Sequence, residues 1–495
     1  MEKLLLGIDI GTSACKVAIF NKKGTVLAQS TQGYPLYYPN PGWVEQNPDE
    51  WWNSICIAIK DVLHNKNINA NQIVGIGIDG QSWSAIPVDQ SGNCLHNTPI
   101  WMDTRARAIA EQVTADLGFD TIFNIAGNAF EAAYTTPKIL WFKQNKPMMY
   151  QETYKFLQSN SYIALKLTGK FTQDKSQGYG LHFFNAKTCT YDRDLANSLG
   201  IPLDKVPTIY DCHEVIGSVT AQAAELTGLF IGTPVVAGGL DAACGTLGAG
   251  VYLTGQTQEQ GGQAGGMSIC LDKATAHPKL ILSPHVVPNL WLLQGGTVGG
   301  GGVLRWFKQE LGGDSSFDEL TALAAQISAG SEGVIFLPFM AGERSPIWDP
   351  DSKGVFYGLG FDKTKAHMIR AALEGVAYSL EHNLRTANES GVEINELIAM
   401  GGASNSVVWT QIKADVTGKT IKVPTSDTAT TLGAAILAGV GVGLYESFED
   451  AVAQTIVITR THEPNLKNHE TYKRFMELYL ELYDDLKDTF KKGTV

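Results

Sequence analysis

Three stretches of the sequence combine glycine with residues that can bind phosphate or move a proton. In the first, Asp9 and Lys16 flank the turn residues Gly11, Thr12 and Ser13, which follow an apolar run. Glycine beside hydroxyl residues lets backbone N–H groups and Oγ atoms face phosphate oxygens without a side chain in the way. An Asp beside such a turn can hold hydrated Mg²⁺, and a Lys offsets negative charge. Taken alone, this stretch is also compatible with an ordinary hairpin and a capping Asp.

The second stretch presents a carboxylate with open space around it. Asp241 follows the run 235–240, which predicts a buried strand, and small residues surround it. These neighbours leave room for a substrate hydroxyl to reach the carboxylate. An Asp with an ordinary pKa of about 3.9 is a weak base. It suffices when it takes the proton late in phosphoryl transfer, where positioning does most of the catalysis. The alternative role is a helix N-cap.

The third stretch is a Gly-Gly turn after the apolar run 398–400. Gly401 and Gly402 precede Ala403, Ser404 and Asn405, where we expect a strand to end and a helix to begin. Such a turn permits close approach by a flat base or a phosphate, because glycine adds no side chain. A simple strand-to-helix connection has the same pattern.

Other motifs fail on their context. Gly75–Gly80 matches G-x-G-x-x-G, but Pro87 and the turn at 89–92 follow instead of a helix. The tail Gly418-Lys419-Thr420 lacks the upstream glycine of a Walker loop. An esterase built on Ser82 would need glycine, not serine, at position 84. The histidines show no H-E-x-x-H and no clustering, so a metal cage built by the protein is not supported.

The elements that must position these residues indicate a duplicated α/β fold. Two strands joined by the turn at 11–13, with a third from Thr25, open the chain. A second glycine-turned hairpin, around Gly262-Gln263-Ala264-Gly265-Gly266, begins about 250 residues later. Helical periodicity occurs at 51–64, 317–328, 366–390 and in the aromatic stripe from Tyr472 to Leu486. We interpret this stripe as helix packing.

Length and composition set the scale of the molecule. The chain has 495 residues, whereas single cores stop growing near roughly 250–300 residues. We therefore expect two domains, 1–249 and 250–495, that join near Gly250. The net charge of −12 argues against a nucleic-acid partner. Seven cysteines without a C-x-x-C, and no apolar run of membrane-spanning length, predict a soluble cytoplasmic protein without a membrane partner.

Together these residues resemble the FGGY family of carbohydrate kinases, within the actin/hexokinase/Hsp70 ATPase superfamily. The resemblance covers essentially the whole chain, and the chain is most similar to the xylulose-kinase members of the family. The matching stretches are Asp9-x-Gly11-Thr12-Ser13-x-x-Lys16, Pro41–Pro48 with Trp51-Trp52, Asp241, Gly342-Glu343-Arg344-Ser345-Pro346 and Gly401-Gly402-Ala403-Ser404-Asn405.

The resemblance implies two ribonuclease-H-like domains, an interdomain catalytic cleft, ATP and Mg²⁺, and often a homodimer. It assigns Asp241 as the catalytic base and Asp9 as a ligand of Mg²⁺ through water. The other implied nucleotide contacts are Gly11, Thr12, Ser13, Lys16, Gly262 and Gln263 around phosphates, and Gly401, Gly402 and Asn405 around adenosine.

The implied sugar contacts are Gln81, Ser82, Trp83, Asp103 and Tyr134, together with Asp241. Relatives that phosphorylate xylulose typically have Gly-Gln-Met-His-Gly at the position where this chain has Gly80-Gln81-Ser82-Trp83-Ser84. Ser82-Trp83 therefore replaces the usual Met-His pair. Gln263 stands where they usually have Thr. The expected reaction is phosphorylation of a primary hydroxyl of a ketopentose, D-xylulose first. Ribulose, erythritol and gluconate are the alternative acceptors.

A different class of function is a superfamily ATPase that acts as a chaperone or regulator. That class predicts a substrate-binding region after the nucleotide domain or an N-terminal DNA-binding helix pair. We expect neither feature here, because the first predicted phosphate motif begins at residue 9 and the final helical pattern extends almost to Val495.

Overall fold

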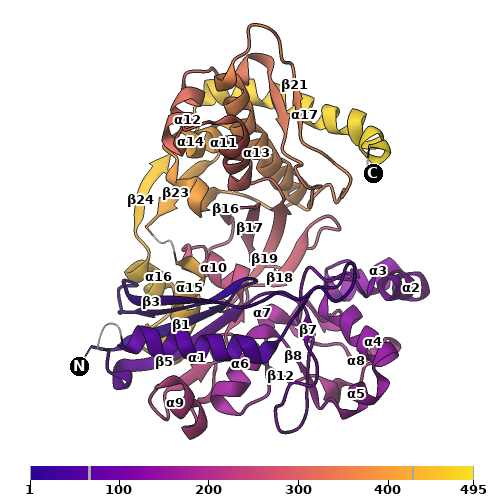
Figure 1. Cartoon of the computed structure of the whole chain (residues 1–495), viewed down its shortest axis with the longest axis vertical. Helices are drawn as coiled ribbons and strands as arrows, with labels where there is room; N and C mark the ends of the chain where they lie inside the picture. Colours follow the sequence, from indigo (N-terminus) through magenta and orange to yellow (C-terminus); the bar gives the residue numbers. More distant parts are fainter. Residues whose placement is uncertain (1, 65–67, 426–427, 494–495) are drawn as a thin grey trace.

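Two seven-stranded sheets form the centres of two lobes, which Figure 1 shows one above the other. The computed structural model describes residues 2–64, 68–425 and 428–493. The lower sheet runs in the order β13 (Val215–Ser218), β14 (Pro234–Val236), β5 (Ile73–Gly80), β1 (Leu4–Ile10), β2 (Ala14–Phe20) and β3 (Val26–Gly33), with β15 (Gly239–Leu240) paired to β5. The upper sheet runs in the order β18 (Ile281–Pro284), β19 (Trp291–Thr297), β17 (Gly265–Leu271), β16 (Gln256–Gly261), β22 (Glu396–Met400), β23 (Thr420–Pro424) and β24 (Ile458–His462).

The two sheets share one pairing pattern. In the lower lobe β1 is antiparallel to β2 and parallel to β5, and in the upper lobe β16 is antiparallel to β17 and parallel to β22. The next strands also correspond, since β14 and β23 each continue the parallel set and β13 and β24 each close it in the antiparallel sense. The predicted internal duplication is therefore confirmed.

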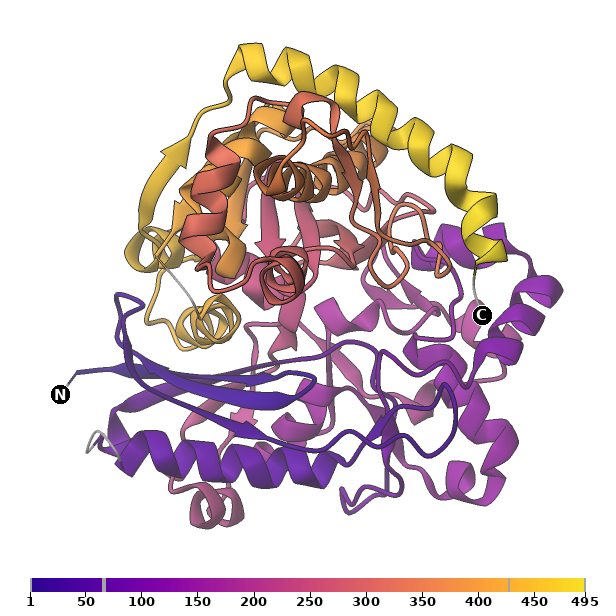
Figure 2. The same ribbon diagram turned by 45° about the horizontal axis from the view of Figure 1, so that its top comes forward.

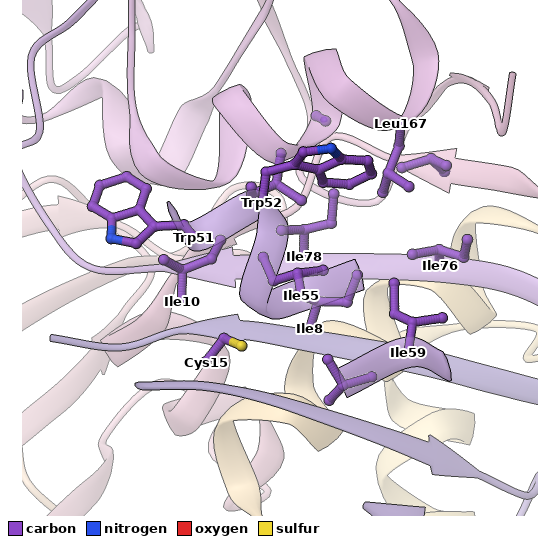
Figure 3. Close-up of a cluster of buried hydrophobic side chains, with 14 of the residues drawn as sticks. Ile8, Ile10, Cys15, Trp51, Trp52, Ile55, Ile59, Ile76, Ile78 and Leu167 are labelled. Carbon is purple, nitrogen blue, oxygen red and sulfur yellow. The ribbon is translucent and has the colours of Figure 1, made fainter. Parts of the chain in front are cut away.

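The core of the lower lobe lies between its sheet and helix α1 (Pro48–His64). Trp51, Trp52, Ile55 and Ile59 of α1 are buried against Ile8, Ile10, Ile76 and Ile78 of the central strands, as Figure 3 shows. Acidic residues in the first turn of the helix and a histidine in the last complement its dipole. Burial of each large apolar side chain contributes about 1.5–3 kcal/mol, so this face holds α1 on the sheet.

The lower lobe has further helices, several of which form a second hydrophobic cluster of their own. They are α2 (Arg107–Leu117), α3 (Phe119–Ala126), α4 (Thr135–Asn145), α5 (Pro147–Glu152), α6 (Ser159–Thr168), α7 (Lys175–Gly178), α8 (Arg193–Ser198) and α9 (Ala221–Thr227). In the upper lobe the helices are α11 (Gly301–Leu311), α12 (Phe317–Ala325), α13 (Lys365–Asn388), α14 (Val407–Thr417) and α17 (Leu466–Lys492).

The aromatic stripe of α17 packs as the sequence predicted. Tyr472 and Tyr479 are fully buried, and the Tyr472 hydroxyl lies 2.7 Å from Glu374 of α13. Figure 2 shows α17 crossing the outer surface of the upper lobe. No helix within the described ranges is long and apolar enough to cross a bilayer.

Helix α15 (Ala429–Gly441) comes from the second half of the chain but packs on the lower sheet, along β1 and β5, and against α10 (Asp241–Gly248). Glycines make this approach possible. A Cβ on Gly77 would lie 1.8 Å from the Ala434 carbonyl oxygen, and one on Gly248 would lie 1.8 Å from that of Ala429. The chain therefore crosses between the lobes more than once, and the boundary at 249/250 stays a prediction.

Candidate active site

A cavity of about 440 Å³ lies between the lobes and is lined from both of them. The lower lobe contributes Thr12, Ser82, Trp83, Trp101, Tyr179, Asp241 and Ala242. The upper lobe contributes Gln260, Gly262–Ser268, Ile281, Gln294–Gly296 and Arg344. The two halves of the duplicated fold thus place a carboxylate and a glycine-rich loop on one interlobe cavity.

Asp241 begins α10 directly after β15. Its Oδ1 accepts a hydrogen bond from the Ala242 N–H at 2.6 Å. The N-cap position belongs to Leu240, which has no side-chain cap, so the N-cap role considered for Asp241 does not apply. Burial, assisted by the negative charge of Asp9, raises the pKa of Asp241 to about 7. A carboxylate with a pKa near the working pH is suited to general base catalysis.

Asp9 and Asp79 lie side by side on the parallel strands β1 and β5. Both carboxyl groups are buried, and the Asp79 oxygens receive no hydrogen bond from an N–H or O–H of the described residues. Burial raises the pKa of both groups, and the charge of Asp9 raises that of Asp79 further. Lys16, opposite Asp9 on β2, partly offsets the effect of burial on Asp9. Because burial raises the pKa of both groups, a cation beside the pair would favour its ionised, negatively charged form.

Side chains of the lower lobe hold the turn at 11–13, which is the first predicted phosphate site. The Trp101 indole N–H donates to the Thr12 Oγ at 3.0 Å, and the Gln46 amide donates to the Thr12 carbonyl oxygen at 2.8 Å. Tyr34 donates to the carbonyl oxygen of Gly11 at 2.5 Å. Ser13 is exposed at the tip of the turn. The turn is therefore fixed before any ligand binds.

The glycine loop at 262–264, which is predicted to hold phosphate, joins β16 to β17 and rests on the start of α11. The N–H groups of Gly301 and Gly302 donate to the carbonyl oxygens of Gly262 and Gln263, at 2.7 and 3.0 Å. A Cβ on Gly300 would lie 2.3 Å from the carbonyl carbon of Ala264. Only glycine permits this contact, and Gln263 is left exposed on the cavity.

The Gly-Gly turn lies beside this second loop. Gly401 has φ 84°, and a Cβ there would lie 2.9 Å from the carbonyl atoms of Gly261. Gly402 and Asn405 are exposed in a short 3₁₀ turn (Gly402–Asn405) between β22 and α14. The structure thus confirms the predicted strand-to-helix turn and brings it next to the phosphate loop, although these residues do not line the cavity itself.

Aromatic rings form a wall on the opposite lobe. The Trp83 ring stacks on Tyr134 at 4.1 Å between centroids, and the Tyr179 hydroxyl donates to the Ser82 Oγ at 3.1 Å. Trp83 has φ 62°, a conformation that costs a bulky residue free energy and is held by its surroundings. The buried Lys138 ammonium donates to the Trp83 carbonyl oxygen at 2.9 Å. Ser82 and Trp83 line the cavity, and Tyr134 supports Trp83.

Two residues predicted to contact the sugar, Asp103 and Gln81, make hydrogen bonds to other residues of the protein. Asp103 is fully buried, and its oxygens accept hydrogen bonds from the Arg105 guanidinium and the Val44 N–H. The Gln81 amide donates to Gln46 at 2.7 Å. Neither residue lines the cavity. They support the loops that do, and their direct contact with a sugar stays a prediction.

Three residues of the site went unrecognised in the sequence. Asp79 would have been found from the register of β1 and β5, since Asp9 and Asp79 are paired there. Tyr179 and Arg344 reach the cavity from segments distant in sequence. No local pattern distinguishes Tyr179 from a structural residue, whereas Arg344 lies in the matching stretch 342–346 but was not predicted to reach the site.

Comparison with known proteins assigns this chain to a family. Residues 4–248 match the N-terminal domain, and residues 270–442 the C-terminal domain, of the FGGY family of carbohydrate kinases. A xylulose kinase of Bacillus subtilis is 30% identical over 98% of this chain and 98% of its own length. A gluconokinase of Bacillus licheniformis is 29% identical over 99% of this chain and 97% of its own length.

Solved structures show the same architecture. A gluconate kinase from Lactobacillus acidophilus superposes with a TM-score of 0.92 at 26% identity and covers 100% of both chains. A xylulose kinase from the same organism also has a TM-score of 0.92 at 26% identity, and covers 99% of this chain and 100% of its own. The predicted α/β class with two actin/hexokinase-like domains is confirmed. The chain belongs to the FGGY family of carbohydrate kinases and is a sugar kinase.

Proposed function

We propose that this enzyme transfers the γ-phosphoryl group of ATP to a primary hydroxyl of D-xylulose, with Asp241 as the base. The observation that carries this proposal is the position of Asp241. It lies on the interlobe cavity, which the glycine loop of the upper lobe also lines, and its pKa is raised to about 7.

In the proposed reaction the sugar oxygen attacks the γ-phosphorus. An O–P bond forms, the P–O bond to ADP breaks, and the hydroxyl proton passes to the Asp241 carboxylate. Because little covalent chemistry falls to the protein in phosphoryl transfer, positioning and charge stabilisation supply most of the rate. Gly11, Thr12 and Ser13 would hold phosphates from below, and Gly262 with Gln263 from above.

The acidic pair fits a role in binding Mg-ATP. Asp79 carries two buried oxygens without a donor, and Asp9 lies beside it. Within the described residues, no three Asp, Glu, His or Cys side chains are arranged to hold a metal. Mg²⁺ would therefore be held mainly by phosphate oxygens and water, with Asp9 fixing one water. When bound, the ion neutralises phosphate charge.

Support for D-xylulose comes from the relatives that match over nearly the full chain and carry the name xylulose kinase. Gluconate is the second candidate, because gluconokinases match over a similar length. Ser82 and Trp83, on the cavity wall, would set this preference, since sites that hydrogen-bond specific hydroxyls discriminate strongly. Adenosine binding by Gly401, Gly402 and Asn405, and a homodimer, remain predictions.

The test is a coupled ADP-release assay with Mg-ATP over D-xylulose, L-xylulose, D- and L-ribulose, erythritol, glycerol and gluconate. We expect the highest kcat/KM for D-xylulose. A higher value for gluconate would replace the proposed substrate and keep the kinase. ADP release that no acceptor increases would contradict the proposed reaction.

A further inference from the structure

Arg344 is a cationic side chain on the cavity, and its guanidinium makes no hydrogen bond or ion pair with the residues that the structure describes. It belongs to the loop 342–346 of the upper lobe, is partly buried and lines the cavity. Within the described part of the chain, no carboxylate, carbonyl or hydroxyl group accepts a hydrogen bond from its guanidinium. The adjacent Glu343 carboxylate is already used, since its Oε1 accepts the N–H groups of Val298 and Arg344, each at 2.7 Å.

The loop holds Arg344 in a defined position. The Ser345 Oγ accepts the Gly296 N–H at 2.7 Å, and Asn383 of α13 donates to the Ser345 carbonyl oxygen at 3.0 Å. A Cβ on Gly296 would lie 2.9 Å from the Arg344 Cζ. The guanidinium therefore lies across the bare backbone of Gly296, and β19 carries glycine where the side chain must pass.

The guanidinium acts on the aromatic wall of the other lobe. Its positive charge opposes the rise in pKa that burial causes in Tyr134 and Tyr179. Tyr179 lines the same cavity and is bonded to Ser82. Trp83, Asp241 and Arg344 line the same cavity. A sugar placed against Trp83, with its reacting hydroxyl at Asp241, would therefore lie near Arg344 on the side of the upper lobe.

We propose that Arg344 binds oxygen atoms of the acceptor sugar and contributes to the choice of acceptor. The inference rests on the proposed kinase reaction. A guanidinium offers five N–H donors in a planar fork and no acceptor, so it suits the keto and hydroxyl oxygens of a ketose or the carboxylate of a sugar acid. Through this contact the acceptor is held by both lobes, and not by the lower lobe alone.

The test compares Arg344→Met and Arg344→Lys with the unmodified enzyme, using the acceptor that gives the highest kcat/KM in the panel. A change of preferred sugar would thus overturn the proposed substrate and leave this test intact. Hydrogen bonds to charged groups contribute about 1.5–3 kcal/mol, so we expect Arg344→Met to raise the KM and the calorimetric dissociation constant of the acceptor at least tenfold. The dissociation constant of ADP should change less than twofold.

The lysine variant separates the two kinds of acceptor oxygen. With a sugar acid, Arg344→Lys should restore affinity to within about threefold, because a point charge still attracts a carboxylate. With a neutral ketose, it should remain close to the methionine variant, because the fork is lost. Either outcome supports contact with the acceptor.

Gly296→Ala gives an independent perturbation that keeps the charge. The backbone at Gly296 has no positive φ, so alanine fits there, but its Cβ displaces the guanidinium. We expect a several-fold weaker acceptor affinity, and no further loss when it is combined with Arg344→Met. Arg474→Met is the matched control, since Arg474 is exposed on α17. An acceptor KM within twofold of the unmodified enzyme in Arg344→Met, or a selective loss of ADP affinity, would overturn the proposal.

Discussion

At the scale of single residues, burial is what makes Asp241 a base. Its carboxylate has one hydrogen bond, from its neighbour's N–H, and lies near the negative charge of Asp9. An exposed Asp would be ionised well below neutral pH and would bind a proton only weakly. Burial brings the pKa to about 7, where the carboxylate is largely ionised at pH 8 and still attracts a proton.

This pKa predicts a pH dependence in which activity and stability move in opposite directions. The base must be ionised, so kcat/KM for the sugar should fall about tenfold per pH unit below about pH 7. The folded pKa lies above the unfolded value, so the folded state binds more protons between about pH 4 and 7. The stability contribution of Asp241 therefore falls as the pH rises through that range.

The measurement is a pH–rate profile together with unfolding temperatures of the unmodified enzyme and Asp241→Asn. We expect Asp241→Asn to unfold at a higher temperature at pH 8 and at nearly the same temperature at pH 4. A flat profile of kcat/KM from pH 5.5 to 8 would show that Asp241 does not titrate in the reaction.

Those residues of the cavity that belong to local sequence motifs could mostly be predicted from the sequence. Thr12 and Asp241 follow strands, and Gly262 lies in a glycine turn, so their positions depend on short segments only. Asp103 and Gln81 were expected at the sugar but are bonded to Arg105 and Gln46. Which side chain satisfies a buried charge depends on tertiary neighbours, and these lie outside any local pattern.

At the scale of elements, close packing of α10 against α15 fixes the position of the Asp241 carboxylate. Gly433 of α15 approaches the carbonyl of Cys244 in α10, where a Cβ would lie 1.9 Å from the oxygen. Because Asp241 begins α10, any separation of the two helices would move the carboxylate. The sequence shows these glycines but does not reveal that α15 returns to the lower sheet, since this contact joins segments almost 200 residues apart.

Two glycines of α10 provide a matched test of this packing. A Cβ on Gly248 would lie 1.8 Å from the Ala429 carbonyl oxygen, whereas one on Gly245 would lie 3.8 Å from its nearest neighbour, the Gln258 amide nitrogen. Gly248→Ala should destabilise the protein by roughly 1–3 kcal/mol, through overpacking. Gly245→Ala should be neutral or slightly stabilising, because alanine favours the helix. Urea unfolding midpoints measure both, and equal midpoints would contradict the packing argument.

At the scale of the whole molecule, the duplicated fold places two hairpin turns on one cavity. Glycine-turned hairpins about 250 residues apart were sufficient to predict two related halves, because hairpin geometry is local. Whether the two turns face each other across one cavity depends on how the lobes pack, and α15 contributes to this packing. The proposed reaction therefore takes place between the lobes, where residues of both lobes line the cavity and Asp241 lies on it.

The most direct test of this account is Asp241→Asn assayed for both ligands. Loss of a general base reduces rates by about 10²–10⁴, so we expect ADP release with D-xylulose to fall at least a hundredfold. The dissociation constants of ADP and of the sugar, measured by calorimetry, should stay within about threefold of those of the unmodified enzyme. Turnover by Asp241→Asn within tenfold of the unmodified enzyme would contradict the assignment of Asp241 as the base.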